Sequence, residues 1–221
     1  MIPPTSIDGT DITGATIDGT DVQEITVDGD VVFTSGFSYF DDFDTNTLSD
    51  YTIHETNLGV SKNFTISGSE LIQPDNNGYF FVYYDVSSEG LTDFFVEQVT
   101  NVYPDNDWSG VGFLVDGSTI VSGDIRIQLN EAAIGFDSFP TPLVYASDYD
   151  DVNTVSHTDF ATPFTVRIEY DSSTDTATLF VNGVEKVSIN FTLSGTVTDC
   201  GMVIAGNDPG LHLESFEIGS L

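Results

Sequence analysis

The chain has 221 residues, and its 36 acidic residues against four Lys and Arg give a formal net charge of −32 at pH 7. Four basic side chains cannot neutralise the phosphates of a nucleic acid, and the negative charge opposes binding to an anionic membrane surface, so both partners are excluded. Hydrophobic residues make up 39% of the sequence and aromatic residues 12%, far more than a disordered acidic tail contains. One main folded domain is therefore expected.

Three features of the sequence bear on its compartment. The single Cys200 excludes an intramolecular disulfide and a zinc site built from cysteines. No apolar run approaches the roughly 18 residues of a membrane span, so no membrane insertion is expected. Residues 1–5 have neither the basic nor the apolar region of a signal peptide. We expect the chain to be made in the cytosol and either to stay there or to leave inside something that is assembled there.

The acidic residues are mostly aspartates, 26 Asp against 10 Glu, and lysine is limited to Lys62 and Lys186. A surface of this kind repels itself in dilute buffer, and concentrated salt screens the repulsion. The composition resembles that of proteins from extreme halophiles. The alternative is an acidic protein that binds Ca²⁺ at many sites, which would need calcium to fold even in molar KCl.

The N-terminal segment carries a repeat with a period of ten residues. The segment Ser6–Ile12 returns as Thr16–Val22 and, more loosely, as Thr26–Val31, each with a β-branched residue before an Asp-Gly pair. Asp-Gly favours the type I′ turn, so each unit is predicted to be a small hairpin. Such hairpins are barely stable alone.

Two interpretations of this repeat remain open. One is a flexible extension, and the other is a β module over residues 1–35 that gains order by packing on a neighbouring subunit, a second copy or another partner protein. The apolar residues predicted to mediate this assembly are Ile7, Ile12, Ile17, Val22, Ile25, Val27, Val31 and Phe33.

The second domain is predicted to span residues 36–221 and to be all-β. Strand-like segments alternate with Asp, Asn and Gly turns every 8–12 residues or so, which indicates an antiparallel sandwich. The expected strands include 64–66, 78–86, 93–99, 110–115, 124–129, 165–170, 177–181, 184–190 and 211–218. Val166, Ile168 and Tyr170 alternate with polar residues, so this strand should bury one face. Asn182-Gly183 should close a tight hairpin.

Several segments together carry a resemblance to a known family. They are Phe40-Asp41-Asp42-Phe43-Asp44, Leu48–Tyr51, Trp108–Val115, the hairpin of residues 166–183, and Leu211–Ile218. Their order resembles concanavalin A-like lectin/glucanase sandwiches of the laminin-G-like type over residues 37–221. The resemblance implies a jelly roll of two curved antiparallel sheets in which the first and last strands pair.

The N-terminal repeat is similar to short segments in structural proteins of tailed viruses. With the acidic composition, the whole chain resembles a virion structural protein of a tailed virus of halophilic archaea. The resemblance implies a capsid turret, a head decoration, or a tail-tip or fibre subunit. Its partners would be other virion proteins, further copies of itself, and a glycan or glycoprotein of the host surface.

Catalysis is not expected. Glucanases of the resembled type place acids as Glu-x-Asp-x-x-Glu along one strand, and no such run occurs. Glu169-Tyr170-Asp171 runs into a turn, and Glu214 and Glu217 are expected on opposite strand faces. Ser156-His157-Thr158-Asp159 is expected to be a polar loop, since neighbours in sequence do not converge as a triad. The histidines, His54, His157 and His212, lack metal-ligand spacing.

A structural Ca²⁺ is the one cofactor under consideration, and none is certain. Asp42, Asp44 and Asn46 offer oxygen ligands at alternate positions, without the glycine and distal glutamate of an EF-hand. The resemblance implies an ion that ties the first strand to the last, with Glu214 as a further ligand. The alternative is a set of solvated acids.

Sugar binding requires exposed aromatic rings beside hydrogen-bonding groups. The residues predicted to supply both are Tyr103, Asp105, Asp107, Trp108, Tyr145, Asp148, Tyr149 and Asp150. The alternative is that Tyr103 and Trp108 belong to the core. The sequence thus predicts a non-enzymatic virion surface protein that presents a lectin-like sandwich to the host. The alternative function is a stand-alone glycan-binding or glycan-hydrolysing protein of a halophile.

The charge of the chain predicts a steep dependence of stability on salt. Screening removes long-range repulsion among the carboxylates, and at 0.1 M salt the Debye length is still about 10 Å. We expect dialysis to about 0.1 M salt to abolish the near-UV circular dichroism of the folded protein. A melting temperature that is the same in dilute and in molar KCl would contradict the halophilic interpretation.

Overall fold

The computed structural model describes residues 36–55, 63–73, 78–102, 108–116, 163–190, 192–193, 195–206 and 211–221, and short strands within 6–34 and 120–154. The chain divides into two compact units, Met1–Phe37 and Ser38–Leu221. The described residues are almost all in antiparallel strands and turns, with one short 3₁₀ helix, η1 (Leu48–Asp50). They include no helix that is long and apolar enough to cross a membrane.

The first unit contains the three hairpins that the repeat predicts. They are β1 (Ser6–Ile7) with β2 (Thr10–Asp11), β3 (Thr16–Ile17) with β4 (Thr20–Asp21), and β5 (Glu24–Val27) with β6 (Asp30–Thr34). Of the residues predicted to mediate assembly, Ile12 and Val22 lie outside the described residues and the other six are in these strands. Their role in assembly stays a prediction.

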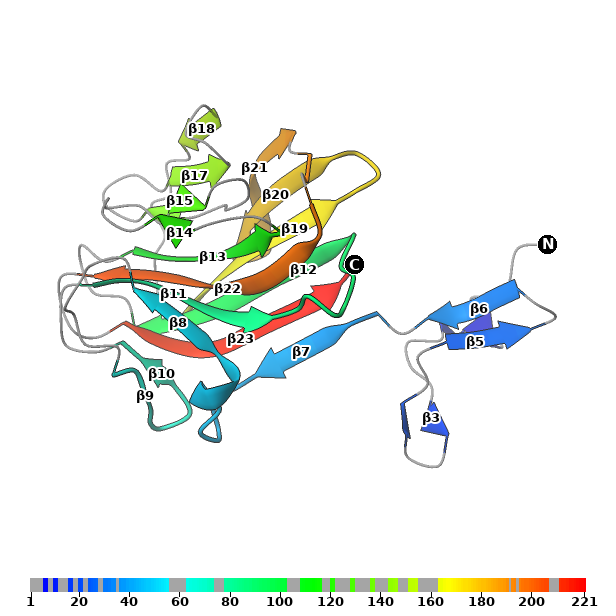
Figure 1. The fold of residues 1–221 in the computed structure, drawn as a ribbon, viewed down its shortest axis with the longest axis horizontal. Coiled ribbons are helices and arrows are strands. Elements are labelled where there is room, and N and C mark those ends of the chain that lie inside the picture. The colour runs from blue at the N-terminus through cyan, green and yellow to red at the C-terminus, as the bar shows by residue number, and fades with distance from the viewer. Residues whose placement is uncertain are drawn as a thin grey trace. The chain divides into compact units, whose positions relative to one another are not determined.

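The second unit is built on an eight-stranded sheet with the order β21-β20-β19-β12-β23-β10-β9, in which β7 also pairs with β23 (Figure 1). The strands are β7 (Ser38–Asp41), β9 (Thr65–Ile66), β10 (Leu71–Ile72), β12 (Phe94–Val102), β19 (Phe164–Asp171), β20 (Thr176–Val181), β21 (Val184–Asn190) and β23 (His212–Ser220). Tyr39 in β7 pairs with Ile218 in β23. The expected pairing of the first and last strands of the sandwich is therefore confirmed.

A four-stranded sheet with the order β13-β22-β11-β8 covers one face of the large sheet (Figure 1). Its strands are β8 (Thr52–Glu55), β11 (Gly78–Asp85), β13 (Trp108–Val115) and β22 (Val197–Gly206). Next to β13 lies β16 (Phe136–Asp137), which pairs with β17 (Leu143–Ala146), which in turn pairs with β18 (Asp151–Thr154). A separate pair is formed by β14 (Ile120–Val121) and β15 (Gln128–Leu129).

The core lies between the two main sheets. The rings of Phe94 in β12 and Phe113 in β13 meet edge to face with centroids 5.0 Å apart, and both are fully buried. Strand β19 alternates buried and half-buried residues along its whole length, as its sequence pattern predicts. Asn182 and Gly183 have φ values of 51° and 70°, which are those of the predicted type I′ turn. The all-β sandwich is thus confirmed.

The centre of the four-stranded sheet is also tightly packed. A Cβ atom on Gly201 of β22 would lie 2.4 Å from the carbonyl oxygen of Val82, so only glycine fits there. The neighbouring Cys200 is fully buried, and burial raises the pKa of its thiol well above the usual value. This cysteine is a core residue without the features of a reactive thiol.

A buried carboxylate, Asp41, fixes the start of the sandwich. Only 5% of Asp41 is exposed, and its oxygens accept hydrogen bonds from the hydroxyls of Thr47 at 2.6 Å and Tyr51 at 2.9 Å. The backbone N–H of Phe43 donates a third, at 2.8 Å. The Tyr39 hydroxyl donates to that of Tyr51 at 3.2 Å. Burial raises the pKa of Tyr39 to about 12 and that of Tyr51 further, so both remain protonated donors.

Replacing this carboxylate should destabilise the sandwich. In Asp41→Ala three donors lose their acceptor, two of them buried, at a cost of about 1–3 kcal/mol for each buried group left unsatisfied, so we expect a loss of at least about 2 kcal/mol. Chemical denaturation in molar KCl measures it. The matched control is Asp42→Ala, since Asp42 is exposed and such changes usually cost less than about 0.5 kcal/mol. Equal losses in the two variants would contradict the assignment.

Candidate functional site

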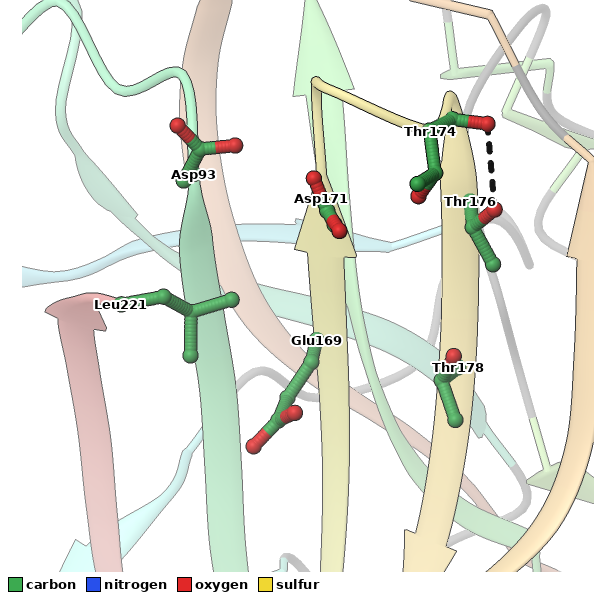
Figure 2. Close-up of a pocket in the computed structure, with 7 residues that line it drawn as sticks. All are labelled: Asp93, Glu169, Asp171, Thr174, Thr176, Thr178 and Leu221. Atoms are coloured by element: carbon green, nitrogen blue, oxygen red, sulfur yellow. Dashed lines mark hydrogen bonds between the residues drawn. The ribbon is translucent and has the colours of Figure 1, made fainter.

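A polar depression of about 440 Å³ lies on the exposed face of the eight-stranded sheet (Figure 2). Its lining residues come from the start of β12, the ends of β19 and β23, and β20 with the turn before it. They are Asp93, Glu169, Asp171, Thr174, Thr176, Thr178 and Leu221. Four neighbouring strands thus contribute to one surface.

Strand register explains why these side chains share a face. Alternate residues of a strand point to the same side, so Glu169 and Asp171 point outward while Tyr170 between them is buried. Antiparallel pairing sets Asp171 opposite Thr176 and Glu169 opposite Thr178. At the other side of the depression, the backbone N–H of Leu221 donates to the carbonyl oxygen of Asp93 at 3.0 Å.

Two of the carboxylates are held by the turn that follows β19. Asp93 accepts a hydrogen bond from the backbone N–H of Ser172 at 2.7 Å. Asp171 accepts from the hydroxyl of Ser173 at 2.6 Å and from its backbone N–H at 2.8 Å. These hydrogen bonds lower the pKa of Asp171, and the bond from the Ser173 hydroxyl has the largest effect. Asp171 therefore stays ionised to a lower pH than an ordinary aspartate.

Arg167 places a positive charge at the depression. Its Nε lies 2.7 Å from Glu169 Oε1, one of its terminal nitrogens lies 3.7 Å from Glu97, and its guanidinium lies 3.7 Å above the Phe95 ring. Burial raises the pKa of Glu97, and Glu217 and Glu169 add to this, while Arg167 opposes it. Arg167 thus pairs with Glu169 of the lining and with Glu97 outside it, and no basic side chain is among the described residues that line the depression.

This lining suits a ligand rich in hydroxyl groups. Carboxylates accept hydrogen bonds from hydroxyls, and threonine hydroxyls both donate and accept. The threonine methyl groups and Leu221 offer small apolar contacts. Asp171 does not suit the role of general acid, because a general acid needs a raised pKa and that of Asp171 is lowered. The arrangement can bind a polyol.

The residues predicted to bind sugar fall largely outside the described part of the chain. Tyr103, Asp105, Asp107, Asp148, Tyr149 and Asp150 lie outside the described residues. Trp108 and Tyr145 are placed by their backbones in β13 and β17, opposite Ala205 and Val152. These assignments stay predictions. Residues 103–107 are flanked by the end of β12 and the start of β13. Both of these strand ends lie at the end of the sandwich opposite the depression.

The predicted metal ligands all lie in the described part of the chain, but their side chains are not brought together into a metal site. Asp42, Asp44 and Asn46 are exposed, and Asp42 and Asn46 accept hydrogen bonds from the backbone N–H groups two residues on, at 3.1 and 3.4 Å. Glu214 is exposed where the pairing of β23 with β12 is irregular. Among the described residues, no group of three or more His, Cys, Asp and Glu side chains has the geometry to hold a metal ion. The calcium site stays a prediction.

His212 takes part in a polar cluster at that opposite end of the sandwich. Its Nδ1 lies 2.6 Å from Glu70 Oε2, and the Asn101 amide donates to the other Glu70 oxygen. Burial alone would raise the pKa of Glu70, but the hydrogen bonds from Asn101 and His212 lower it. The cluster joins the end of β12 and the first residue of β23 to the segment before β10. His157 lies outside the described residues.

Comparison with known proteins identifies the fold. No family model and no curated protein matches the sequence. Among solved structures, lectin II from Ulex europaeus matches 85% of this chain and 100% of its own at 13% identity and a TM-score of 0.63. Basic winged bean lectin matches 84% of this chain and 98% of its own at 16% identity and 0.61. The Emp46p carbohydrate recognition domain matches 77% and 88% at 10% identity and 0.56.

These similarities define the fold and not the ligand. At 10–16% identity the shared feature is the architecture, a concanavalin A-like antiparallel sandwich of the lectin type. The fold implied by the sequence motifs is therefore confirmed for the second unit. The hairpin unit before it is also as expected.

Proposed function

We propose that the sandwich binds carbohydrate without catalysis, at the depression shown in Figure 2. Support comes from a lining of carboxylates and threonine hydroxyls on a fold shared with lectins. In the matched structures, the basic winged bean lectin is described with Tn-antigen and the lectin UEA-II is complexed with galactose. A non-catalytic role agrees with the sequence, in which no Glu-x-Asp-x-x-Glu run occurs.

We further propose that the protein acts on the surface of a virion, assembled in the host cytoplasm, as a turret, head decoration or tail subunit. Its glycan or glycoprotein target would belong to the host cell. Support comes from the N-terminal hairpins, which form a unit separate from the sandwich, and from the sequence resemblance of this repeat to virus segments. A stand-alone glycan-binding protein of a halophile agrees equally with the fold.

Substitutions in the depression should weaken glycan binding. Thr176→Val and Asp171→Asn each remove hydrogen-bonding capacity with little change of shape, and a lost bond of about 1.4 kcal/mol lowers affinity about tenfold. A glycan array in molar KCl finds the ligand, and titration calorimetry measures each variant. The control is Thr165→Val, which lies on β19, the strand that pairs with that of Thr176, but outside the depression. A blank array, or equal weakening by the control, would contradict the proposal.

Removal of residues 1–34 should separate folding from assembly. The truncated chain keeps the sandwich, whose strands β7 to β23 pair only with one another among the described residues. We expect it to fold in molar salt and to lose attachment to particles and self-association. Size-exclusion chromatography with light scattering compares it with the full chain. The anchoring role is wrong if both chains are monomers and the truncated one still attaches to particles.

A further inference from the structure

A second depression, of about 470 Å³, lies where β11 ends and contains an aromatic ring. It is lined by Asp50, Tyr84, Asp85, Ser87 and Ser88. These residues come from η1, the last two positions of β11, and the turn that follows β11. None of them lines the depression of Figure 2. The two depressions therefore share no lining residue, and the aromatic ring is found in the second one.

The aromatic ring of this depression is held rigidly. The Tyr84 ring stacks on that of Tyr39 with centroids 3.9 Å apart and an angle of 27°, and it meets the Tyr51 ring edge to face at 6.4 Å. Tyr39 and Tyr51 belong to the hydrogen-bonded network of Asp41. Tyr84 is only half-buried, and its exposed part lines the depression. A ring fixed in this way needs no reordering to receive a ligand.

The polar groups around the ring are also fixed. Asp85 accepts a hydrogen bond from the backbone N–H of Ser87 at 2.9 Å. The turn is tied to β22, because the N–H of the buried Val86 donates to the carbonyl oxygen of Thr198 at 2.8 Å. On the other side, the N–H of Asp50 donates to the carbonyl oxygen of Thr47 at 2.9 Å. Carboxylate and hydroxyl groups thus flank a preorganised aromatic ring.

An apolar ring beside hydrogen-bond acceptors matches the two surfaces of a pyranose, which has a face of C–H groups and a rim of hydroxyls. Charge narrows the ligand class further. Asp85 stays ionised because bonds from Ser87 lower its pKa, and Asp199 lies directly opposite it across the pair β11–β22. A uronic or sialic acid would meet like charges, since no basic side chain is among the described residues of this lining.

We propose that the Tyr84 depression is a second carbohydrate-binding site, which takes a neutral pyranose with its C–H face on Tyr84 and its hydroxyls on Asp50 and Asp85. The inference rests on the proposed carbohydrate binding of the sandwich but not on the Figure 2 depression. Both depressions lie at the same end of the sandwich, joined by residues 86–93. Each chain would then bind two sugars, and clustered chains would bind a glycan-coated surface with added avidity.

The experiment counts the sites on the full chain in molar KCl. Calorimetry and NMR titration with galactose, N-acetylglucosamine, mannose and galacturonate give the number of sites and the affinities. We expect two sites for a neutral sugar in the wild type and one in Tyr84→Leu. We expect about tenfold weaker binding at the second site in Asp50→Asn and no change in the control Asp44→Asn, an exposed acid outside both linings. Galacturonate should bind at least tenfold more weakly than galactose.

The outcomes separate this site from the first. A single site that is lost in the Asp171→Asn, Thr176→Val double variant and unchanged in Tyr84→Leu and Asp50→Asn would overturn the inference and leave the proposed function. A single site lost with Asp50→Asn and kept in the double variant would support the inference and overturn the assignment to Figure 2. No binding of any sugar would overturn both. Because Tyr84→Leu removes a stacked ring, Asp50→Asn provides the test that does not depend on the packing of the core.

Discussion

The C-terminal strand β23 is the element on which the large sheet depends. One edge of β23 pairs with β12, and the other edge is shared between β7 and β10. Segments from both ends of the sandwich sequence therefore meet on one strand, and the sheet closes only when the last residues of the chain are in place. Pairings of such sequence separation are slow to form, so we expect this sheet to be completed late in folding.

Charge is distributed unevenly over this framework. Arg167 is one of only four basic residues in the chain. It is held by Glu97, Glu169 and the Phe95 ring at the centre of the exposed sheet face. Glu169, which lines the first depression, shares this partner, whereas the other carboxylates of the two linings pair with no basic side chain among the described residues. Arg167 thus offsets part of the negative charge on this face of the sheet.

The sequence predicts the parts of the fold whose patterns are local. The hairpins of residues 164–190 follow from alternation and from Asn182-Gly183. The sequence does not predict β22, the longest of the described strands, because Asp199 and Gly201 interrupt its alternation and the glycine is required only by the packing against Val82. Likewise, three neighbouring acids look equivalent in sequence, but only the first, Asp41, is buried, because strand register turns it inward.

The residues of the candidate site can also be predicted only where they follow a local pattern. The alternation of apolar and polar residues in β19 predicts that Glu169 lies on the solvated face. Asp93 and Leu221 lie beside Glu169 only because of the registers of β12 with β19 and β23. The Tyr84 depression depends on η1 and a turn, which follow no periodic pattern. The buried Cys200 offers a way to follow this framework. Because it sits on the central strand β22, a thiol reagent reaches it only when β22 opens, so its labelling rate reports the free energy of opening of the four-stranded sheet without any introduced probe.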